Sequence, residues 1–238
     1  MTATARSLSI VIPAYNEAGN IVATLENVAL ALAGLDLDAE ILVVDDGSRD
    51  ATGDLVRAHA ARFPNVTLLV NAKNLGFGAT YRRGVEAATR DHIVMVHGDN
   101  AWGAETLRAF FDRTGEADVV IGFTRNMWRS RSIGRTVLSK AFTALVNAMT
   151  GRRLRYYNGL QIHRADVLKR LVIQSTGYGF QAEVLVKALR QTQSFVQVPM
   201  DLIEREHGES KAFRLKNAID VVRTLRRLRA IGAEGPAR

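Results

Sequence analysis

Residues 41–48, with the sequence ILVVDDGS, constrain the fold of this chain more than any other stretch. The apolar run 41–44 is short, β-branched and without polar alternation, which is typical of a strand covered on both faces of a parallel sheet. Asp45 and Asp46 follow where that strand leaves the sheet. Ligands of open α/β sheets bind at the carboxyl ends of the strands, so the acid pair is placed to contact a ligand or forms a solvated turn.

The rest of the chain alternates strand patterns with helix patterns, which predicts an α/β domain with parallel strands and right-handed crossovers. Short apolar runs predict strands, and apolar residues repeated every three or four positions predict helices. We expect further strands at residues 8–12, 66–70, 91–96, 117–122 and 195–203. We expect helices at residues 21–32, 52–63, 79–89, 104–114, 135–150, 181–192 and 213–231.

The composition restricts the class of partner. The 238 residues carry a net charge of +8, which indicates a nucleic acid, a phosphorylated ligand or an acidic lipid surface. Nucleic acid is disfavoured because the few aromatic residues are not interleaved with the basic ones as a stacking platform requires. The absence of cysteine excludes disulfides, thiolate zinc sites and cysteine nucleophiles. Residues 1–9 lack the apolar region of a signal peptide, and no apolar run approaches the roughly 18 residues of a membrane span.

Two loops at strand ends carry candidate ligand-binding residues. Gly76 and Gly78 precede a predicted helix, and the unpaired N–H groups of a helix N-terminus favour an anion, although a plain loop has the same pattern. Asp99 follows the strand predicted at 91–96, where a carboxylate can hold a divalent ion that neutralises a diphosphate. His97 is either a second ligand, if the ion is Mn²⁺, or a residue that fills the loop.

Three motifs occur in order along the chain: IPAYNE at 12–17, VVDDGS at 43–48 and NLGFG at 74–78. Their order and spacing resemble the family 2 glycosyltransferases, and most closely the dolichyl- or polyprenyl-phosphate mannose synthase group. The resemblance implies the GT-A (Rossmann-like) fold, a three-layer α/β sandwich with a central, mostly parallel sheet. It also implies inverting transfer of a mannose- or glucose-type sugar from a GDP- or UDP-sugar to a polyprenyl or dolichyl phosphate.

The resemblance assigns roles to individual residues. It implies that the nucleotide-sugar is bound by Pro13, Tyr15, Glu17, Asp45, Asp46, Gly76, Asp99, Arg205 and Lys211. The acceptor phosphate is expected at Arg125, Arg135 and Ser139. The residues expected to take part in catalysis are Asp99, Arg125 and Glu183, with Glu183 orienting the acceptor or a basic side chain. Residues 205–211 match a loop that closes over the donor, with Gly208 as its hinge.

The chain departs from the pattern of that family at two positions. The family usually has Asp-Ala-Asp with Gln two positions on, whereas this chain has His97, Gly98 and Asp99, followed by Asn100 and Ala101. Mg²⁺ or Mn²⁺ is still the expected cofactor, with Asp99 and His97 as its ligands, although two of the three usual side chains are replaced. The second departure is Arg155, which stands where the family often has an aspartate.

Residues 119–165 contain nine Lys or Arg and no Asp or Glu. A solvated face normally mixes charges of both signs, so this block suits an acceptor phosphate and an anionic leaflet. Within it, Leu138, Phe142, Leu145 and Met149 form a helical stripe. The stripe is interpreted first as core, and alternatively as an interfacial helix with Trp128 at the headgroup level.

The C-terminal part is expected to be a separate segment. A transferase domain at 1–211 would be followed at 212–238 by a basic amphipathic helix with Ile219, Val222, Leu225 and Leu228 on one side. Such a helix fits a membrane surface or a partner helix, including that of a membrane-anchored partner subunit. The expected location is cytoplasmic, peripheral on the membrane.

Two other functions remain open. One is a glycosyltransferase acting on a hydroxyl acceptor of a polysaccharide or protein, which would need a general base, and Glu183 is the one candidate. The other is a non-catalytic subunit that binds nucleotide-sugar, suggested by the depleted metal loop.

Overall fold

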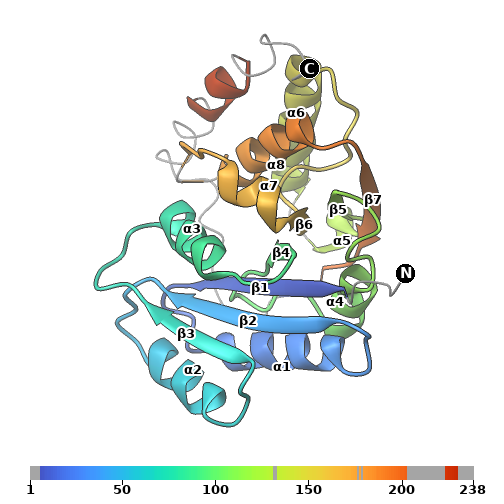
Figure 1. Ribbon diagram of the computed structural model, residues 1–238. Helices are drawn as coiled ribbons and strands as arrows, with labels where there is room; N and C mark the ends of the chain where they lie inside the picture. Colours follow the sequence, from blue (N-terminus) through green and yellow to red (C-terminus); the bar gives the residue numbers. More distant parts are fainter. Residues whose placement is uncertain (1–5, 131–132, 176, 178, 203–222, 230–238) are drawn as a thin grey trace.

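The computed structural model describes residues 6–130, 133–175, 177, 179–202 and 223–229 (Figure 1). In this part of the chain, seven strands form one sheet with the order β3-β2-β1-β4-β6-β5-β7. The strands are β1 (Ser7–Ala14), β2 (Asp38–Asp45), β3 (Val66–Val70), β4 (His92–Met95), β5 (Val119–Thr124), β6 (Gln161–Arg164) and β7 (Phe195–Met200). The helices are α1 (Ile21–Leu32), α2 (Thr52–Ala60), α3 (Phe77–Ala87), α4 (Ala104–Phe111), α5 (Met127–Ser130), α6 (Ile133–Thr150), α7 (Ala165–Arg170) and α8 (Phe180–Gln191).

The sheet is mostly parallel, as predicted. Strands β1, β2, β3 and β4 are parallel to one another, and β5 is parallel to β7. The exception is β6, which is antiparallel to both β4 and β5. Because one reversed strand lies between them, β4 and β5 point the same way. Their carboxyl ends therefore lie on the same edge of the sheet as those of β1 and β2.

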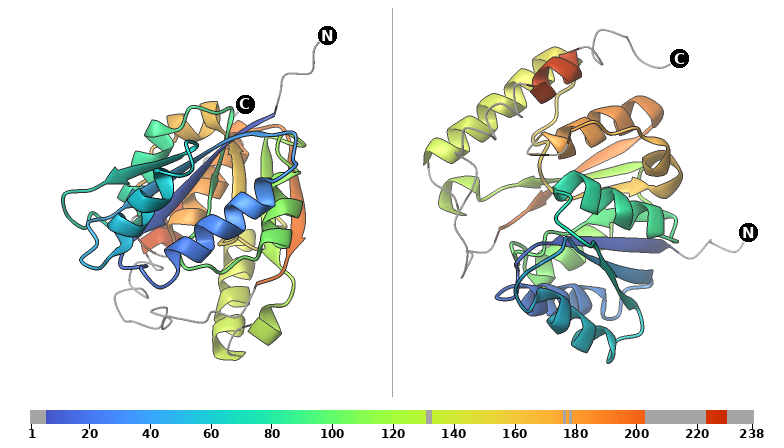
Figure 2. Two further views of the ribbon diagram at one scale, coloured as in Figure 1. Left: turned by 90° about the horizontal axis from the view of Figure 1, so that it is seen from below. Right: turned by 90° about the vertical axis from the view of Figure 1, so that its left-hand side faces the viewer.

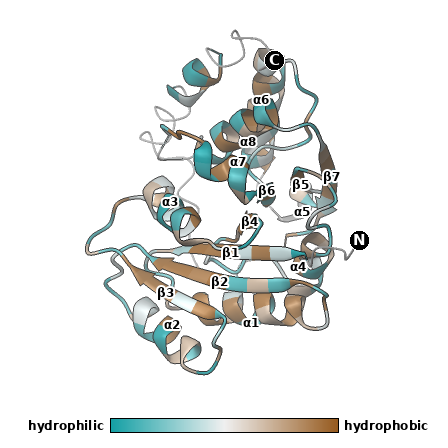
Figure 3. Cartoon of the chain, viewed as in Figure 1, coloured by the Kyte–Doolittle hydropathy of each residue, from teal (hydrophilic) through white to brown (hydrophobic). Residues whose placement is uncertain are grey.

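Helices cover both faces of the sheet, which confirms the predicted three-layer arrangement (Figures 1 and 2). Side chains of β1 alternate between the faces: Ile10 and Ile12 pack in a core with α1, α2 and α4, whereas Val11 packs in a second core with α3, α7 and α8. In β2 the carboxyl half is hydrophobic and the amino end is hydrophilic (Figure 3). The acid pair therefore follows the buried part of the strand.

A third core joins β5 to α6, α7 and α8, and it includes Leu228. Residues 223–229 are helical, and within them Thr224 and Leu228 have no exposed area. Leu228 packs in the third core, and Arg227 donates a hydrogen bond to the Ser175 hydroxyl. This stretch thus packs on its own chain, so attachment to a membrane through Leu228 is wrong. Ile219, Val222 and the predicted boundary at 211–212 lie outside the described residues.

Helix α6 differs from the expected burial. Phe142 and Met149 pack against the third core, but Leu138 and Leu145 of the same predicted stripe are 55% and 46% exposed. The interpretation of the whole stripe as core is therefore wrong for these two leucines. Helix α5, helix α7 and strand β6 were not predicted. The two helices are too short for a helical repeat to show, and strand β6 has the sequence QIHR, with one apolar residue.

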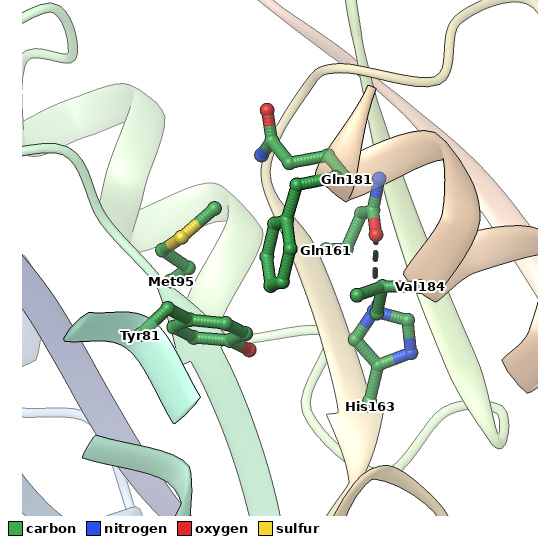
Figure 4. A pocket seen from close by; sticks show the side chains of 7 residues that line it. Tyr81, Met95, Gln161, His163, Gln181 and Val184 are labelled. Carbon is green, nitrogen blue, oxygen red and sulfur yellow. Dashed lines mark hydrogen bonds between the residues drawn. The ribbon is translucent and has the colours of Figure 1, made fainter. Parts of the chain in front are cut away.

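A small internal cavity of about 10 Å³ lies between α3, β6 and α8 (Figure 4). His163, fully buried on β6, lines it and shares a hydrogen bond of 3.1 Å with the Gln161 side chain. Burial lowers the pKa of His163 to about 4, because the charged imidazolium has lost its water. The histidine is therefore neutral in the folded protein at neutral pH.

We expect the free energy of unfolding to fall as the pH drops from 6.5 towards 4, because the unfolded chain takes up a proton at His163 that the folded chain does not. The slope from this residue is about 1.4 kcal/mol per pH unit. Denaturant unfolding over this pH range, in the wild type and in His163→Met, measures it. The variant should have a slope shallower by that amount, and equal slopes would contradict the assignment.

Candidate active site

Backbone hydrogen bonds bring the carboxyl ends of β1, β2 and β3 together. The Asp46 amide donates to the Ala14 carbonyl at 2.8 Å, and the Asn71 amide donates to the Asp45 carbonyl at 2.8 Å. Asp45 and Asp46 are both buried, so the solvated-turn interpretation of the acid pair is wrong. Asp45 accepts a hydrogen bond from the Ser48 amide, which fixes the turn after β2.

The loop after β1 packs on the loop after β2. Asn16 adopts a left-handed conformation with φ of 53°, and its amide donates to the Ser48 hydroxyl at 2.9 Å. The Glu17 amide donates to the Thr52 hydroxyl at 2.8 Å. Tyr15 is 36% exposed at this edge of the sheet. Tyr15 and Glu17, predicted to bind the donor, therefore lie beside the turn that carries the acid pair.

Asp46 holds the glycine loop that precedes α3. Its Oδ1 accepts hydrogen bonds from the Asn71 side chain and the Leu75 amide, both at 2.8 Å, and its Oδ2 accepts one from the Gly76 amide at 2.9 Å. Gly76 has a φ of 86°, a conformation that side chains disfavour, and the space where a Cβ would stand is open. The Leu75 and Gly76 amides are therefore already bound to Asp46, so an anion at the predicted cradle would be held by the N–H groups that follow them, in the first turn of α3.

The loop after β4 lies against the end of β1. A Cβ on Gly98 would come within 3.3 Å of the Pro13 carbonyl oxygen, so the two backbones are in close contact. The Thr24 hydroxyl of α1 donates to the Gly98 carbonyl and accepts from the Asn100 amide. Asn100 is held at a φ of 52°, with its side-chain oxygen bonded to Asn27.

Asp99 is held within this loop, and its Oδ1 atom is shielded from solvent. The ring of His97 stacks on Phe77, with centroids 5.6 Å apart, and so connects this loop to the first turn of α3. Glu17, Asp46, Gly76 and Asp99 thus come from four distant parts of the sequence to one edge of the sheet. The left-handed conformations of Asn16 and Asn100 were not predicted, although asparagine after a strand is a signal for that conformation.

Few of the described side chains at this edge of the sheet are available to bind a metal ion, which fits an ion held mainly by the phosphates of a bound substrate. No group of three His, Cys, Asp or Glu in the described part of the chain could hold a metal. Mg²⁺ is commonly bound by one or two carboxylates together with substrate phosphates and water. A single carboxylate at Asp99, beside the open cradle at Gly76, is compatible with that mode of binding.

A cavity of about 190 Å³ opens beyond the end of β5. Arg125 and Ser139, both predicted to hold the acceptor phosphate, line it, whereas Arg135 is partly exposed on α6 and is not among the lining residues. The Nε and Nη2 atoms of Arg125 donate hydrogen bonds to the Asp201 carboxylate. The lining residues are Thr124, Arg125, Met127, Trp128, Ser139, Lys140, Thr143, Arg155 and Tyr156. Arg205, Gly208 and Lys211 lie outside the described residues.

Glu183 has no exposed area and is surrounded by donors. Its carboxylate accepts hydrogen bonds from the Gln174 and Ser175 amides and from the Lys187 ammonium. Burial raises the pKa of Glu183, but the bonds from Lys187 and Ser175 outweigh it and hold the pKa below its ordinary value. A carboxylate so placed orients a basic side chain, Lys187, and anchors the segment that leads into α8.

The family model described as glycosyl transferase family 2 matches residues 9–171 of the chain. The chain therefore belongs to the family 2 glycosyl transferases, as the three motifs predicted. Undecaprenyl-phosphate mannosyltransferase of Micrococcus luteus is 32% identical over 212 residues, covering 84% of this chain and 85% of the relative. Polyprenol monophosphomannose synthase of Mycolicibacterium smegmatis is 31% identical over 217 residues, covering 85% of this chain and 79% of the relative.

Solved structures confirm the fold. Glucosyl-3-phosphoglycerate synthase of Mycobacterium tuberculosis, in complex with Mn²⁺, UDP-glucose and phosphoglyceric acid, superposes with a TM-score of 0.73 at 21% identity. The match covers 94% of this chain and 80% of that one. The same enzyme with Mg²⁺ and UDP has a TM-score of 0.72 with the same coverage, again at 21% identity.

We expect Glu183→Gln to lower the free energy of unfolding by about 1–3 kcal/mol, because it removes a charged partner from buried donors. The Michaelis constants for donor and acceptor should not change. Denaturant unfolding and initial-rate measurements test both statements, with Glu86→Gln on the exposed face of α3 as a control that should stay within about 0.5 kcal/mol. A stable variant that has lost transfer would restore Glu183 to the catalytic residues.

Proposed function

We propose that this chain transfers a hexosyl residue, mannose or a glucose-type sugar, from a nucleotide-sugar to a polyprenyl or dolichyl phosphate, with inversion. Of the relatives compared above, one is named an undecaprenyl-phosphate mannosyltransferase and the other a polyprenol monophosphomannose synthase. The observation that carries the proposal is the placement of two kinds of site on one edge of the sheet. The acidic loops after β1, β2 and β4 suit a nucleotide-sugar, and the basic cavity after β5 suits a phosphate.

The donor half of the site supplies positioning for a nucleoside diphosphate. We assign the base and ribose to Tyr15, Glu17 and Asp45, and the diphosphate to the N-terminus of α3 after Gly76, where the helix dipole favours an anion. Asp99 would hold Mg²⁺ or Mn²⁺ against the diphosphate, and His97 is its neighbour. The ion would supply charge stabilisation for the leaving diphosphate.

The acceptor half needs no general base. A phosphate oxygen is already ionised near neutral pH, so no proton must be removed before it attacks the sugar. Asp201 engages one edge of the Arg125 guanidinium and so fixes its direction. Catalysis then depends on holding the two substrates in line and on stabilising the leaving group.

A hydroxyl acceptor is disfavoured by the placement of Glu183. That chemistry needs a base, and the one candidate is fully buried and bonded to Lys187 and two amides. A non-catalytic subunit that binds nucleotide-sugar is separated from the proposal by the following experiment.

We expect Asp99→Ala to reduce sugar transfer to a polyprenyl phosphate by about 10²–10³-fold, because it removes the carboxylate that would hold the ion at the leaving diphosphate. Binding of UDP or GDP without metal, measured by calorimetry, should change little. Asp54→Ala, at an exposed position of α2, is the control. A wild type that binds these nucleotides but transfers no sugar from GDP-mannose or UDP-glucose would favour the non-catalytic subunit.

We also propose that the protein works at the anionic cytoplasmic leaflet of a membrane, bound to its surface. No helix in the described part of the chain has the length and apolarity to cross a bilayer. The support comes from α6, whose buried side includes Thr136 and Thr143 while its exposed side is apolar. The exposed positions on that side, which we call the α6 apolar face, are Ile133, Val137, Leu138, Ala141, Ala144, Leu145 and Ala148.

An apolar face with basic residues beside it is the composition of a helix that lies in a membrane interface. At 3.6 residues per turn, the seven positions of the α6 apolar face fall on one side of an 18-residue helix. Trp128 of α5 is 52% exposed, and Lys140 lies over its ring at 4.9 Å. Tryptophan and lysine are suited to the headgroup region. An anchoring partner subunit stays a prediction.

We expect the double variant Leu138→Asp and Leu145→Asp to bind phosphatidylglycerol vesicles at least about tenfold more weakly, because each leucine loses its burial in the acyl region. Vesicle flotation measures the bound fraction. Leu30→Asp on α1, where Leu30 is 63% exposed, is the matched control and should float as the wild type does. Unchanged flotation of the double variant would exclude the α6 apolar face as the contact.

A further inference from the structure

The cavity at the end of β5 contains two cations besides Arg125. Among the described residues, neither Lys140 nor Arg155 forms an ion pair with an acid, whereas Arg125 is paired with Asp201. Each of the two lies over an aromatic ring instead: Lys140 over Trp128 at 4.9 Å and Arg155 over Phe123 at 4.7 Å. A ring holds a cation in place without neutralising its charge. The cavity therefore keeps a positive charge available to a ligand.

The backbone that carries Arg155 is fixed from two sides. The neighbouring Leu154 exchanges two hydrogen bonds with the Asn147 side chain of α6, at 2.8 and 3.0 Å. The Arg155 amide donates to the Gln197 side chain of β7 at 2.8 Å. The guanidinium thus extends from an anchored segment, which reduces the entropy that binding an anion would cost.

The end of the same segment is held against β5 by a close backbone contact. A Cβ on Gly159 would stand 2.1 Å from the Gly122 carbonyl oxygen, so only glycine fits there. The Gly122 amide also donates to the Leu160 carbonyl at 2.8 Å. These contacts fix the distance between the segment and the strand that ends at Thr124, and with it the floor of the cavity.

The floor of the cavity has a hydroxyl that none of the described residues satisfies. Thr124 is 8% exposed and lines the cavity, and its Oγ1 is buried without a hydrogen-bond partner in the described structure. Buried hydroxyls are nearly always bonded, so this atom indicates a missing acceptor. Oγ1 has almost no solvent-accessible area, so it would reach an anion in the cavity only after a rotation about χ1 of Thr124.

We propose that Arg155, with Lys140 and the Thr124 hydroxyl, binds the phosphate monoester of the acceptor, and that Arg155 is a specificity-determining residue for this headgroup. The inference rests on the proposed function and names three residues that it did not assign. The cavity of about 190 Å³ is many times the roughly 10–15 Å³ that one water needs, so a phosphate group has room in it. An arginine fork meets two phosphate oxygens at once.

Binding of farnesyl phosphate, measured by calorimetry without donor or metal, tests the proposal. Arg155→Ala should weaken binding at least tenfold. Arg155→Lys should weaken it less, because lysine keeps the positive charge but cannot bind two phosphate oxygens at once. Thr124→Val should weaken it several-fold. Arg153→Ala, at an exposed position two residues away in the same segment and outside the cavity lining, is the matched control and should stay within twofold. Equal affinities for Arg155→Ala and Arg153→Ala, or a wild type that does not bind farnesyl phosphate, would overturn the proposal.

Two further arms identify the group that is recognised. Farnesol should bind the wild type and Arg155→Ala equally, because it lacks the phosphate. Binding to phosphatidylglycerol vesicles should also be unchanged in Arg155→Ala. A loss confined to the vesicles would assign the cavity to a phospholipid headgroup and overturn the proposal.

Steady-state transfer separates this inference from the proposed function. Arg155→Ala should raise the Michaelis constant for the acceptor at least tenfold. The Michaelis constant for the donor and kcat should stay within twofold of the wild-type values. If the wild type transfers sugar but Arg155→Ala matches Arg153→Ala, the inference fails and the function stands. If the wild type binds farnesyl phosphate through Arg155 but transfers no sugar, the function fails and the anion site stands.

Discussion

The hydrogen bonds accepted by the Asp46 carboxylate are the interaction on which the rest of the site depends. A buried charge is stable only where donors surround it, and here the donors are the Asn71 side chain and the amides of Leu75 and Gly76. The same bonds shape the loop that begins α3. One carboxylate after β2 therefore holds the loop that leads into α3 in place before any ligand arrives.

The sequence predicted the elements whose residues carry their own local signal. The run 41–44, the acid pair after it and the glycines before α3 identified a parallel sheet and its ligand edge, and the ordered motifs identified the family. The short helices α5 and α7 had too few residues for a periodic pattern, and the antiparallel strand β6 has one apolar residue among its four. Contacts between distant segments, such as Thr24 of α1 with the loop of Asp99, have no local signal.

The burial of α6 shows where periodicity fails as a guide to the core. A helical stripe of apolar residues identifies the side that faces the core only when the rest of the helix surface is polar. In α6 the threonines Thr136 and Thr143 face the protein, and the leucines Leu138 and Leu145 face outward. A membrane at the exposed face would remove this conflict, because both sides of the helix would then be covered.

The three separate cores have a consequence for how this enzyme class diversifies. The loops to which the proposed function assigns the nucleotide-sugar follow strands of the first two cores, whereas the inner side of α6 and residues around Tyr157 pack in the third. In the proposed function, substitutions on α6 would therefore repack the third core and leave the strands that carry the donor loops in place. The lipid that is glycosylated would then be free to change in evolution while the part of the fold assigned to the activated sugar is inherited.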